Sequence, residues 1–202
     1  MEVVRLTIQD DLTTPKGLAK AMDAVNTPNA IIILFGALPC IGGSQWQRLN
    51  WHRGNADTRA KILEHRRIFE ILWRNFVIVA KRCLALGGGV AFEWPRNCDY
   101  WGYKRVRTFL ERHKFGKVHF DGCMYGLTSS VPGNAGKLIR KPWTIATLMK
   151  ELELLCRRCS HKANEHAPCA GLDTKTTEGY TDELVISIHQ AVKQWCDAQG
   201  TR

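Results

Sequence analysis

The chain has 202 residues, of which 45% are hydrophobic, and it carries a formal net charge of +10 at pH 7. This length and apolar content exclude global disorder and allow one sizeable core with room for a small appended lobe. The charge indicates a polyanionic partner, first of all nucleic acid, although a soluble basic protein whose charges only face water is the plainer alternative.

The sequence indicates neither an export signal nor a membrane-spanning segment. The start, MEVVRLTIQDDLTT, alternates and then turns acidic, unlike the basic and then apolar pattern of an export signal. The longest apolar run, at 30–38, is too short to cross a bilayer. We therefore expect an intracellular protein, cytoplasmic or nuclear, without membrane association.

The first predicted elements alternate between strand and helix. Residues 3–8 read as a short strand, and Thr14 followed by Pro15 is typical of a helix start, with threonine as the cap and proline in the first turn. The apolar run at 30–35 predicts a strand buried on both faces, as in a parallel sheet. The glycine-rich, polar stretch that follows, at 36–55, is interpreted as a functional loop.

A long helix is expected at 57–86, with an apolar stripe at helical spacing, and three glycines at 87–89 end it. The rest of the chain continues the alternation. Further strands are expected at 90–93, 117–124 and 138–147, a flexible tract at 126–136, and further helices at 103–114, 148–158 and 182–199.

This order of elements predicts an α/β fold with a Rossmann-like, mostly parallel sheet flanked by helices. We expect one domain at 1–147 and a small Cys/His-rich segment with a C-terminal helix at 148–202. In open parallel sheets, ligands bind beyond the carboxyl ends of the strands. Asp11, Cys40 and Glu93 follow or end three predicted strands, so this edge is the expected functional site.

Cys40 lies in a loop whose glycines allow close approach of a ligand. A thiol at the carboxyl edge of a strand in a basic protein can ionise more readily than a buried one. Taken alone, a single cysteine after a strand is more often a core or bystander thiol than a nucleophile.

Three motifs in order resemble those of the cytosine-C5 methyltransferases. The run PCIGGS at 39–44 is similar to the family's Pro-Cys-Gln-x-Phe-Ser loop, with Ile41 and Gly43 as departures. The run FEWP at 92–95 resembles the Glu-Asn-Val segment. Tyr-Gly at 125–126, followed by Arg140, resembles the later Tyr-Gly and Gln-x-Arg-x-Arg region across a longer tract.

The resemblance implies a Rossmann-like domain in which Cys40 is the nucleophile at cytosine C6. Glu93 would then be the acid at N3 and Arg140 a cation near O2, acting on a base flipped out of its stack. From the residues alone, Glu93 could instead be a helix-capping or salt-bridged carboxylate, and Arg140 a phosphate contact or a surface charge.

The resemblance also implies an S-adenosylmethionine site, to which Asp11 would contribute near the adenine. The family's Phe-x-Gly-x-Gly turn and the acidic residue ending its second strand have no counterpart here. We therefore do not expect a self-sufficient methyltransferase. A partner chain or a preceding segment would complete the fold. Truncated domains of this kind resemble sequences carried by mobile elements.

A cluster of cysteines and histidines at 156–169 predicts a zinc site, because zinc takes four such ligands and a Cys-x-x-Cys pair is a common first half. Five side chains compete for four places, and the distant Cys123 could also take part. The alternative is a surface loop with incidental cysteines. The five candidates are Cys156, Cys159, His161, His166 and Cys169.

Aromatic and basic side chains alternate just after Cys40, a mixture that suits stacking on exposed bases. The tryptophans of this stretch, Trp46 and Trp51, could equally pack beneath the loop. The residues expected to contact nucleic acid are Ser44, Trp46, Arg48, Lys137 and Lys141.

Three functions remain open at this point. The first is a methyltransferase-like enzyme or enzyme fragment that acts on nucleic acid. The second is a non-catalytic, zinc-stapled module that binds nucleic acid on the same fold. The third is a protein-interaction or assembly component whose basic charge is incidental.

Overall fold

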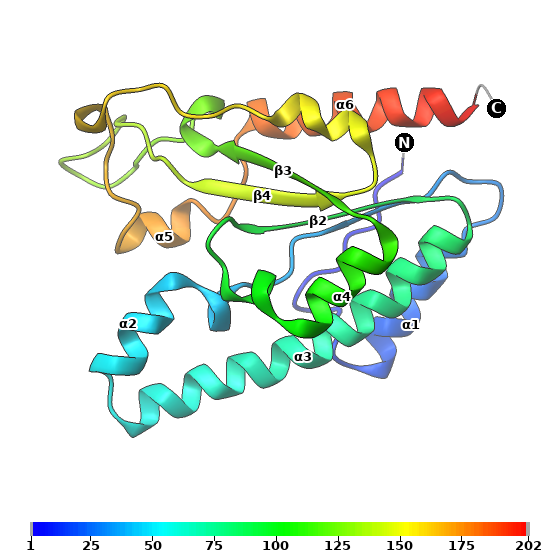
Figure 1. Ribbon diagram of the computed structural model, residues 1–202, viewed down its shortest axis with the longest axis horizontal. Coiled ribbons are helices and arrows are strands. Elements are labelled where there is room, and N and C mark those ends of the chain that lie inside the picture. Colours follow the sequence, from blue (N-terminus) through cyan, green and yellow to red (C-terminus); the bar gives the residue numbers. More distant parts are fainter. Residues whose placement is uncertain (1, 201–202) are drawn as a thin grey trace. The chain divides into compact units, whose positions relative to one another are not determined.

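Helices and strands follow one another from α1 (Pro15–Val25) to α6 (Asp182–Gly200) in the computed structural model, which describes residues 2–200. The fold is mixed α/β (Figure 1). The chain divides into an N-terminal unit that ends at Phe115 and a C-terminal unit that begins at Gly116. The expected boundary at 147/148 thus lies inside the second unit, and the Cys/His segment shares that unit with two strands.

The N-terminal unit begins without the strand expected at 3–8. These residues are exposed and irregular, because no neighbouring segment supplies ladder hydrogen bonds, and Ile8 is 95% exposed. The predicted helix start is confirmed: the Thr14 side chain accepts a hydrogen bond from the Gly17 amide, and Pro15 occupies the first turn of α1.

A parallel pair of strands, β1 (Ile33–Gly36) and β2 (Gly89–Pro95), forms the sheet of this unit, with Ile33 opposite Gly89 and Gly36 opposite Phe92. β2 is buried nearly throughout, but β1 is shorter than expected and half-buried. The prediction of a strand at 30–35 covered on both faces is therefore wrong in its burial and in its first residues.

The long helix α3 (Ala56–Ala85) runs along the N-terminal unit and packs against α1 and β2 (Figure 1). Asn55 caps it by accepting from the Thr58 amide, and Gly87 follows its end with a φ of +77°. The predicted helix at 57–86 is confirmed. Its buried apolar stripe consists of Ile62, Phe69, Trp73, Phe76, Val79, Ala80 and Cys83.

The stretch at 36–55, expected as a loop, contains a further helix, α2 (Gln45–Arg53), none of whose residues is buried. After β2 come a short 3-10 turn, η2 (Asp99–Gly102), and α4 (Lys104–His113), which ends at Lys114 with a φ of 58°. The side chains of α3, β2, η2 and α4 build a core rich in aromatic rings. These rings are Phe69, Trp73, Phe76, Phe92, Trp94, Tyr100, Trp101 and Phe109.

The C-terminal unit contains an antiparallel pair, β3 (Gly116–Asp121) and β4 (Pro142–Thr147), with Gly116 opposite Thr147 and Asp121 opposite Pro142. The connection between them holds only the 3-10 turn η3 (Gly122–Tyr125) and irregular turns. Without a crossover helix the chain returns antiparallel. The mostly parallel, Rossmann-like sheet expected from the sequence is therefore not confirmed.

The helix expected at 148–158 is reduced to the 3-10 segment η4 (Lys150–Leu155), which packs against β3 and α6. Two short elements follow, η5 (Ala163–Glu165) and α5 (Leu172–Thr176), before α6 closes the unit. Across residues 2–200, no helix combines the length and the apolar character needed to span a membrane.

Candidate metal centre

Four side chains of the C-terminal unit bring their ligand atoms within 4.8 Å of one another: Cys123, Cys159, His161 and His166. Cys123 comes from η3, immediately after β3, and is buried. The other three come from the irregular segment after η4 and are partly exposed. Two thiols and two imidazoles in this arrangement could hold a metal ion.

The end of β3 and the segment after η4 are joined by two hydrogen bonds, both made by Asp121. The Asp121 amide donates to the Arg157 carbonyl at 2.9 Å, and the Cys159 amide donates to the Asp121 carboxylate at 2.9 Å. These bonds fix Cys159 beside Cys123, although 35 residues separate the two in the sequence.

His166 is positioned by a second backbone pairing. Leu138 forms a bridge with His166, and the Ala167 amide donates to the Leu138 carbonyl at 2.8 Å. The His166 Nδ1 lies 3.0 Å from the Lys162 carbonyl oxygen. Since a carbonyl only accepts, Nδ1 must carry the proton, which leaves Nε2 with a free lone pair. That nitrogen is the one that faces the cluster, 3.4 Å from the Cys159 Sγ.

The remaining contacts inside the cluster are also short. The Cys159 Sγ lies 3.6 Å from the His161 Nδ1, and the two imidazole rings are 5.8 Å apart. Burial, followed by the neighbouring Cys159 thiol, raises the pKa of Cys123 to about 12. Without a cation in the cluster, the Cys123 thiol therefore keeps its proton at neutral pH.

Three of the five ligands proposed from the sequence come together in the cluster, and two do not. Cys156 is exposed, and the Cys169 Sγ lies 3.6 Å from the Thr177 hydroxyl, so neither belongs to the group within the described residues. Cys123 takes the fourth place. Its distance along the chain gives no spacing signal, and only the folded path of β3 and η3 brings it there.

Asp121 is a buried carboxylate that the sequence did not single out. It is fully excluded from solvent, and it faces two half-exposed guanidinium groups. Its Oδ2 lies 3.5 Å from the Arg158 Nε and 3.9 Å from the Arg140 Nε. Arg140 is thus an ion-pair partner of Asp121, while its expected place beside a cytosine ring stays a prediction.

In the N-terminal unit, Cys40 and Glu93 both lie near the thiol of Cys98. Burial raises the pKa of Cys98 to about 12, and the negative ends of Cys40, Asp99 and Glu93 add to the rise. Cys40 is half-buried at the start of η1 (Ile41–Gly43), whereas Glu93 is buried on β2. Both residues thus influence the same buried thiol, while a joint role of Cys40 as nucleophile and Glu93 as acid stays a prediction.

The glycines after Cys40 do not form an open cradle for S-adenosylmethionine. A Cβ on Gly42 would meet the Tyr100 hydroxyl at 2.4 Å, and a Cβ on Gly43 would meet the Tyr100 ring at 2.8 Å. Their missing side chains therefore make room for Tyr100. Asp11, the expected cofactor contact, accepts hydrogen bonds from the Thr13 amide and hydroxyl. The contribution of Asp11 to a cofactor site stays a prediction.

Several residues expected to contact nucleic acid have partners within their own unit. Arg48 pairs with Asp99, and Lys141 donates to the Thr177 carbonyl while standing 5.3 Å over the Trp143 ring. Lys137 donates to Asn134, and Ser44 precedes α2 without a side-chain capping bond.

The two tryptophans of α2 behave differently. Trp46 is 51% exposed, as a stacking platform requires, and its role in binding stays a prediction. Trp51 is partly covered, with the Arg66 guanidinium 5.8 Å from its ring centre.

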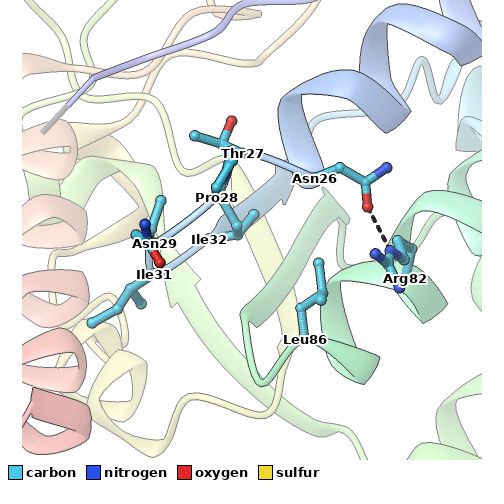
Figure 2. Close-up of a pocket in the computed structure, with 9 residues that line it drawn as sticks. Asn26, Thr27, Pro28, Asn29, Ile31, Ile32, Arg82 and Leu86 are labelled. Carbon is cyan, nitrogen blue, oxygen red and sulfur yellow. Dashed lines mark hydrogen bonds between the residues drawn. The ribbon is translucent and has the colours of Figure 1, made fainter.

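A cavity of about 390 Å³ opens between the end of α1 and the end of α3 (Figure 2). It is lined mainly by the 26–32 turn and by Leu86, and Arg82 donates across it to the Asn26 side chain at 2.6 Å. Both helices present their carbonyl ends here, which disfavours an anion. Its lining has no carboxylate, thiol or imidazole, so it offers none of the acids, bases or metal ligands that an active site commonly needs.

Comparisons with protein-family models, with curated proteins and with solved structures find no match for this chain.

Proposed function

We propose that the C-terminal unit is a zinc-stapled module that binds nucleic acid, with the metal held by Cys123, Cys159, His161 and His166. The observation that carries this proposal is the convergence of two thiols and two imidazoles within 4.8 Å. Zinc in such a site has a structural role, because four protein ligands leave no open position for a substrate.

The spacing around Cys159 is compatible with a tetrahedral ion such as zinc. With Zn–S bonds near 2.3 Å and Zn–N bonds near 2.05 Å, a tetrahedral site places sulfur and nitrogen about 3.5 Å apart. The separations from the Cys159 Sγ to its two histidine partners are 3.4 and 3.6 Å. The hydrogen bond from His166 to Lys162 adds the outer support that zinc-bound histidines commonly have.

Charge supports nucleic acid as the partner. The chain carries a formal charge of +10, and exposed cations surround the cluster, whose own charges cancel when two thiolates bind one zinc ion. Arg140, Arg158 and Lys162 are exposed there. Phosphate oxygens accept hydrogen bonds from side chains of this type without regard to base sequence.

Metal analysis of the purified protein, joined to nucleic-acid binding, tests the proposal. We expect one zinc ion per chain, and an affinity for a labelled single-stranded DNA that falls with salt. Cys159→Ser should lose the metal. Cys156→Ser, a neighbouring cysteine outside the cluster, is the matched control and should keep it. A metal-free wild-type protein, or DNA binding that does not respond to salt, would contradict the proposal.

Thiol addition to a cytosine ring is the second candidate function, favoured by the neighbourhood of Cys40 and Glu93. In this proposal a proton from Glu93 at N3 assists attack of the Cys40 thiolate on C6, and the electron pair moves toward C5. A solvent proton is then taken up at C5 and the original C5 hydrogen is lost to solvent. Expulsion of the Cys40 thiolate and return of the N3 proton to Glu93 restore cytosine and the acid.

Hydrogen exchange at cytosine C5 measures this addition without any methyl donor. We expect deuterium from the solvent to enter C5 of a single-stranded DNA in the presence of the protein. Cys40→Ser should abolish the exchange, and Cys196→Ser, a half-buried thiol on α6, should leave it unchanged. Exchange that survives Cys40→Ser would exclude this second candidate.

A further inference from the structure

Arg140 and Arg158 converge on one oxygen atom of a carboxylate that has no access to water. In both cases the nitrogen nearest to the Asp121 Oδ2 is Nε, at 3.9 and 3.5 Å. The terminal Nη groups therefore lie farther from the carboxylate than Nε does. Both side chains are more than half exposed, so these outer donors reach the solvent.

The charges at this point do not cancel. One carboxylate faces two guanidinium groups, and its Oδ2 also accepts the Cys159 amide at 2.9 Å. Within residues 2–200, neither arginine side chain has a further hydrogen bond or ion pair. A positive charge is left over, together with outward donors that no other group among the described residues uses.

Neighbouring cations of the C-terminal unit are arranged differently. The Arg157 guanidinium pairs with Glu183 at 2.6 Å and lies 4.7 Å over the Tyr125 ring, which ties it to α6 and η3. Lys141 is bound to the Thr177 carbonyl. These two side chains stabilise the unit, whereas Arg140 and Arg158 are held only at their inner edge.

We propose that Arg140 and Arg158 form a phosphate-binding pair for the backbone of a nucleic acid, with Asp121 as the residue that positions both. The proposal rests on the proposed function and identifies the backbone phosphate as the group that the C-terminal unit binds. Guanidinium groups bind phosphate through two parallel N–H donors, which a lysine cannot reproduce. The ion pairs with the buried Asp121 hold both guanidinium groups close together before the ligand arrives, which lowers the entropy cost of binding.

The metal cluster and the arginine pair share this anchor. Cys159 follows Arg158 directly, its amide is fixed by Asp121, and its sulfur belongs to the cluster. We expect loss of the metal to leave this segment held by its hydrogen bonds to Asp121 but no longer by the metal, and so to loosen the position of Arg158 beside Arg140. Phosphate binding by the pair should depend on metal occupancy even though no phosphate touches the metal.

The test measures binding of a fluorescein-labelled single-stranded DNA across a salt series, by fluorescence anisotropy, for the metal-loaded full chain. Arg140→Gln/Arg158→Gln should weaken binding about 10-fold or more and lower the slope of log affinity against log salt by roughly 1.5. Arg107→Gln/Arg112→Gln removes the same charge from exposed positions on α4 and should change both values less.

A charge-preserving variant separates the oriented pair from net charge. Arg140→Lys/Arg158→Lys should keep the salt slope but still lose several-fold in affinity, because the paired donors are gone. Equal zinc content and equal circular dichroism establish that these variants are folded. Removing zinc from the wild type should lower its affinity to that of the double glutamine variant.

The outcomes distinguish this inference from the proposed function. The wild type could bind DNA with a clear salt dependence while the two double glutamine variants lose affinity equally. In that case the phosphate-binding pair is wrong, but the proposed nucleic-acid-binding function is not contradicted. Lysine variants that bind like the wild type would overturn the oriented pair. Absence of binding by the wild type at low salt would overturn both.

Discussion

In the N-terminal unit, aromatic rings from α3, β2, η2 and α4 contact one another, and Trp73 alone lies within 6.3 Å of five other rings. In the C-terminal unit, the stretch from Ser160 to Gly179 has few buried apolar side chains and is held by polar contacts and the Cys/His cluster. The rest of the C-terminal unit, like the N-terminal unit, has a buried apolar core. The stretch from Ser160 to Gly179 depends instead on specific bonds between distant residues, and a metal would supply the strongest of them.

Removal of the metal should have the largest effect and should separate the two units. Structural zinc contributes on the order of 10 kcal/mol of apparent binding free energy in small zinc-dependent domains. We expect a strong chelator, or Cys159→Ser, to abolish hydrogen-exchange protection at 157–170 while α3 keeps its protection. Mass spectrometry of exchanged peptides measures both regions together. Equal loss of protection in α3 and at 157–170 would show that the metal does not stabilise the C-terminal unit selectively.

A core truncation should produce the opposite pattern. Trp73 is 2% exposed, and Trp73→Ala leaves a large cavity, so we expect a loss of about 3–5 kcal/mol in the free energy of unfolding. Denaturant titration monitored by circular dichroism gives the value. Zinc content should stay at the wild-type level, and a variant that loses its metal would show that the two units are not stabilised independently.

Asp121→Ala tests the polar anchor of the C-terminal unit. It removes a charge-assisted hydrogen bond to the Cys159 amide and leaves that donor without its acceptor, at a cost of about 1.5–3 kcal/mol. Metal affinity should also fall by roughly 10–100-fold, as for other outer supports of metal ligands. Competition with a chromophoric chelator measures the affinity. An unchanged metal affinity would show that Asp121 does not support the metal cluster and would limit its role to positioning Arg140 and Arg158.

The smallest predicted effect is a difference in thiol reactivity within the N-terminal unit. Cys98 is buried, and its pKa is raised to about 12, so its reactive thiolate is scarce until the pH approaches that value. Cys40 is half-buried and should react with iodoacetamide first at neutral pH. Peptide mapping resolves the two cysteines, and the unfolded chain, in which both react, is the control. Faster labelling of Cys98 would contradict the described burial.

The spacing of apolar residues in the sequence was sufficient to predict an element where its burial follows the helical period. The spacing of apolar residues predicted α3 to within a residue or two, because a single stripe faces the core along its whole length. The alternation at 3–8 led to a wrong prediction, because alternation shows only that one face could be covered, and Val3 and Ile8 remain 60% and 95% exposed. The direction of β4 could not be predicted either, because it depends on the path of the preceding connection.

The candidate site was predictable in part for a related reason. His161 and His166 follow Cys159 closely, so the sequence places three ligands within reach of one ion. Cys156 has the favoured Cys-x-x-Cys spacing, yet it follows the end of η4 and is exposed. Cys123 and Asp121 gain their roles from the end of β3, where a backbone pairing brings a remote segment beside them.

A metal held by Cys123 and Cys159 would close a long loop of chain, much as a disulfide does, and would restrict the unfolded state accordingly. Unlike a disulfide, this cross-link is in equilibrium with the surrounding ion. Once free zinc exceeds the dissociation constant, each further tenfold rise stabilises the folded form by about 1.4 kcal/mol. The lifetime of the C-terminal unit would then follow zinc availability, while the N-terminal unit would be indifferent to it.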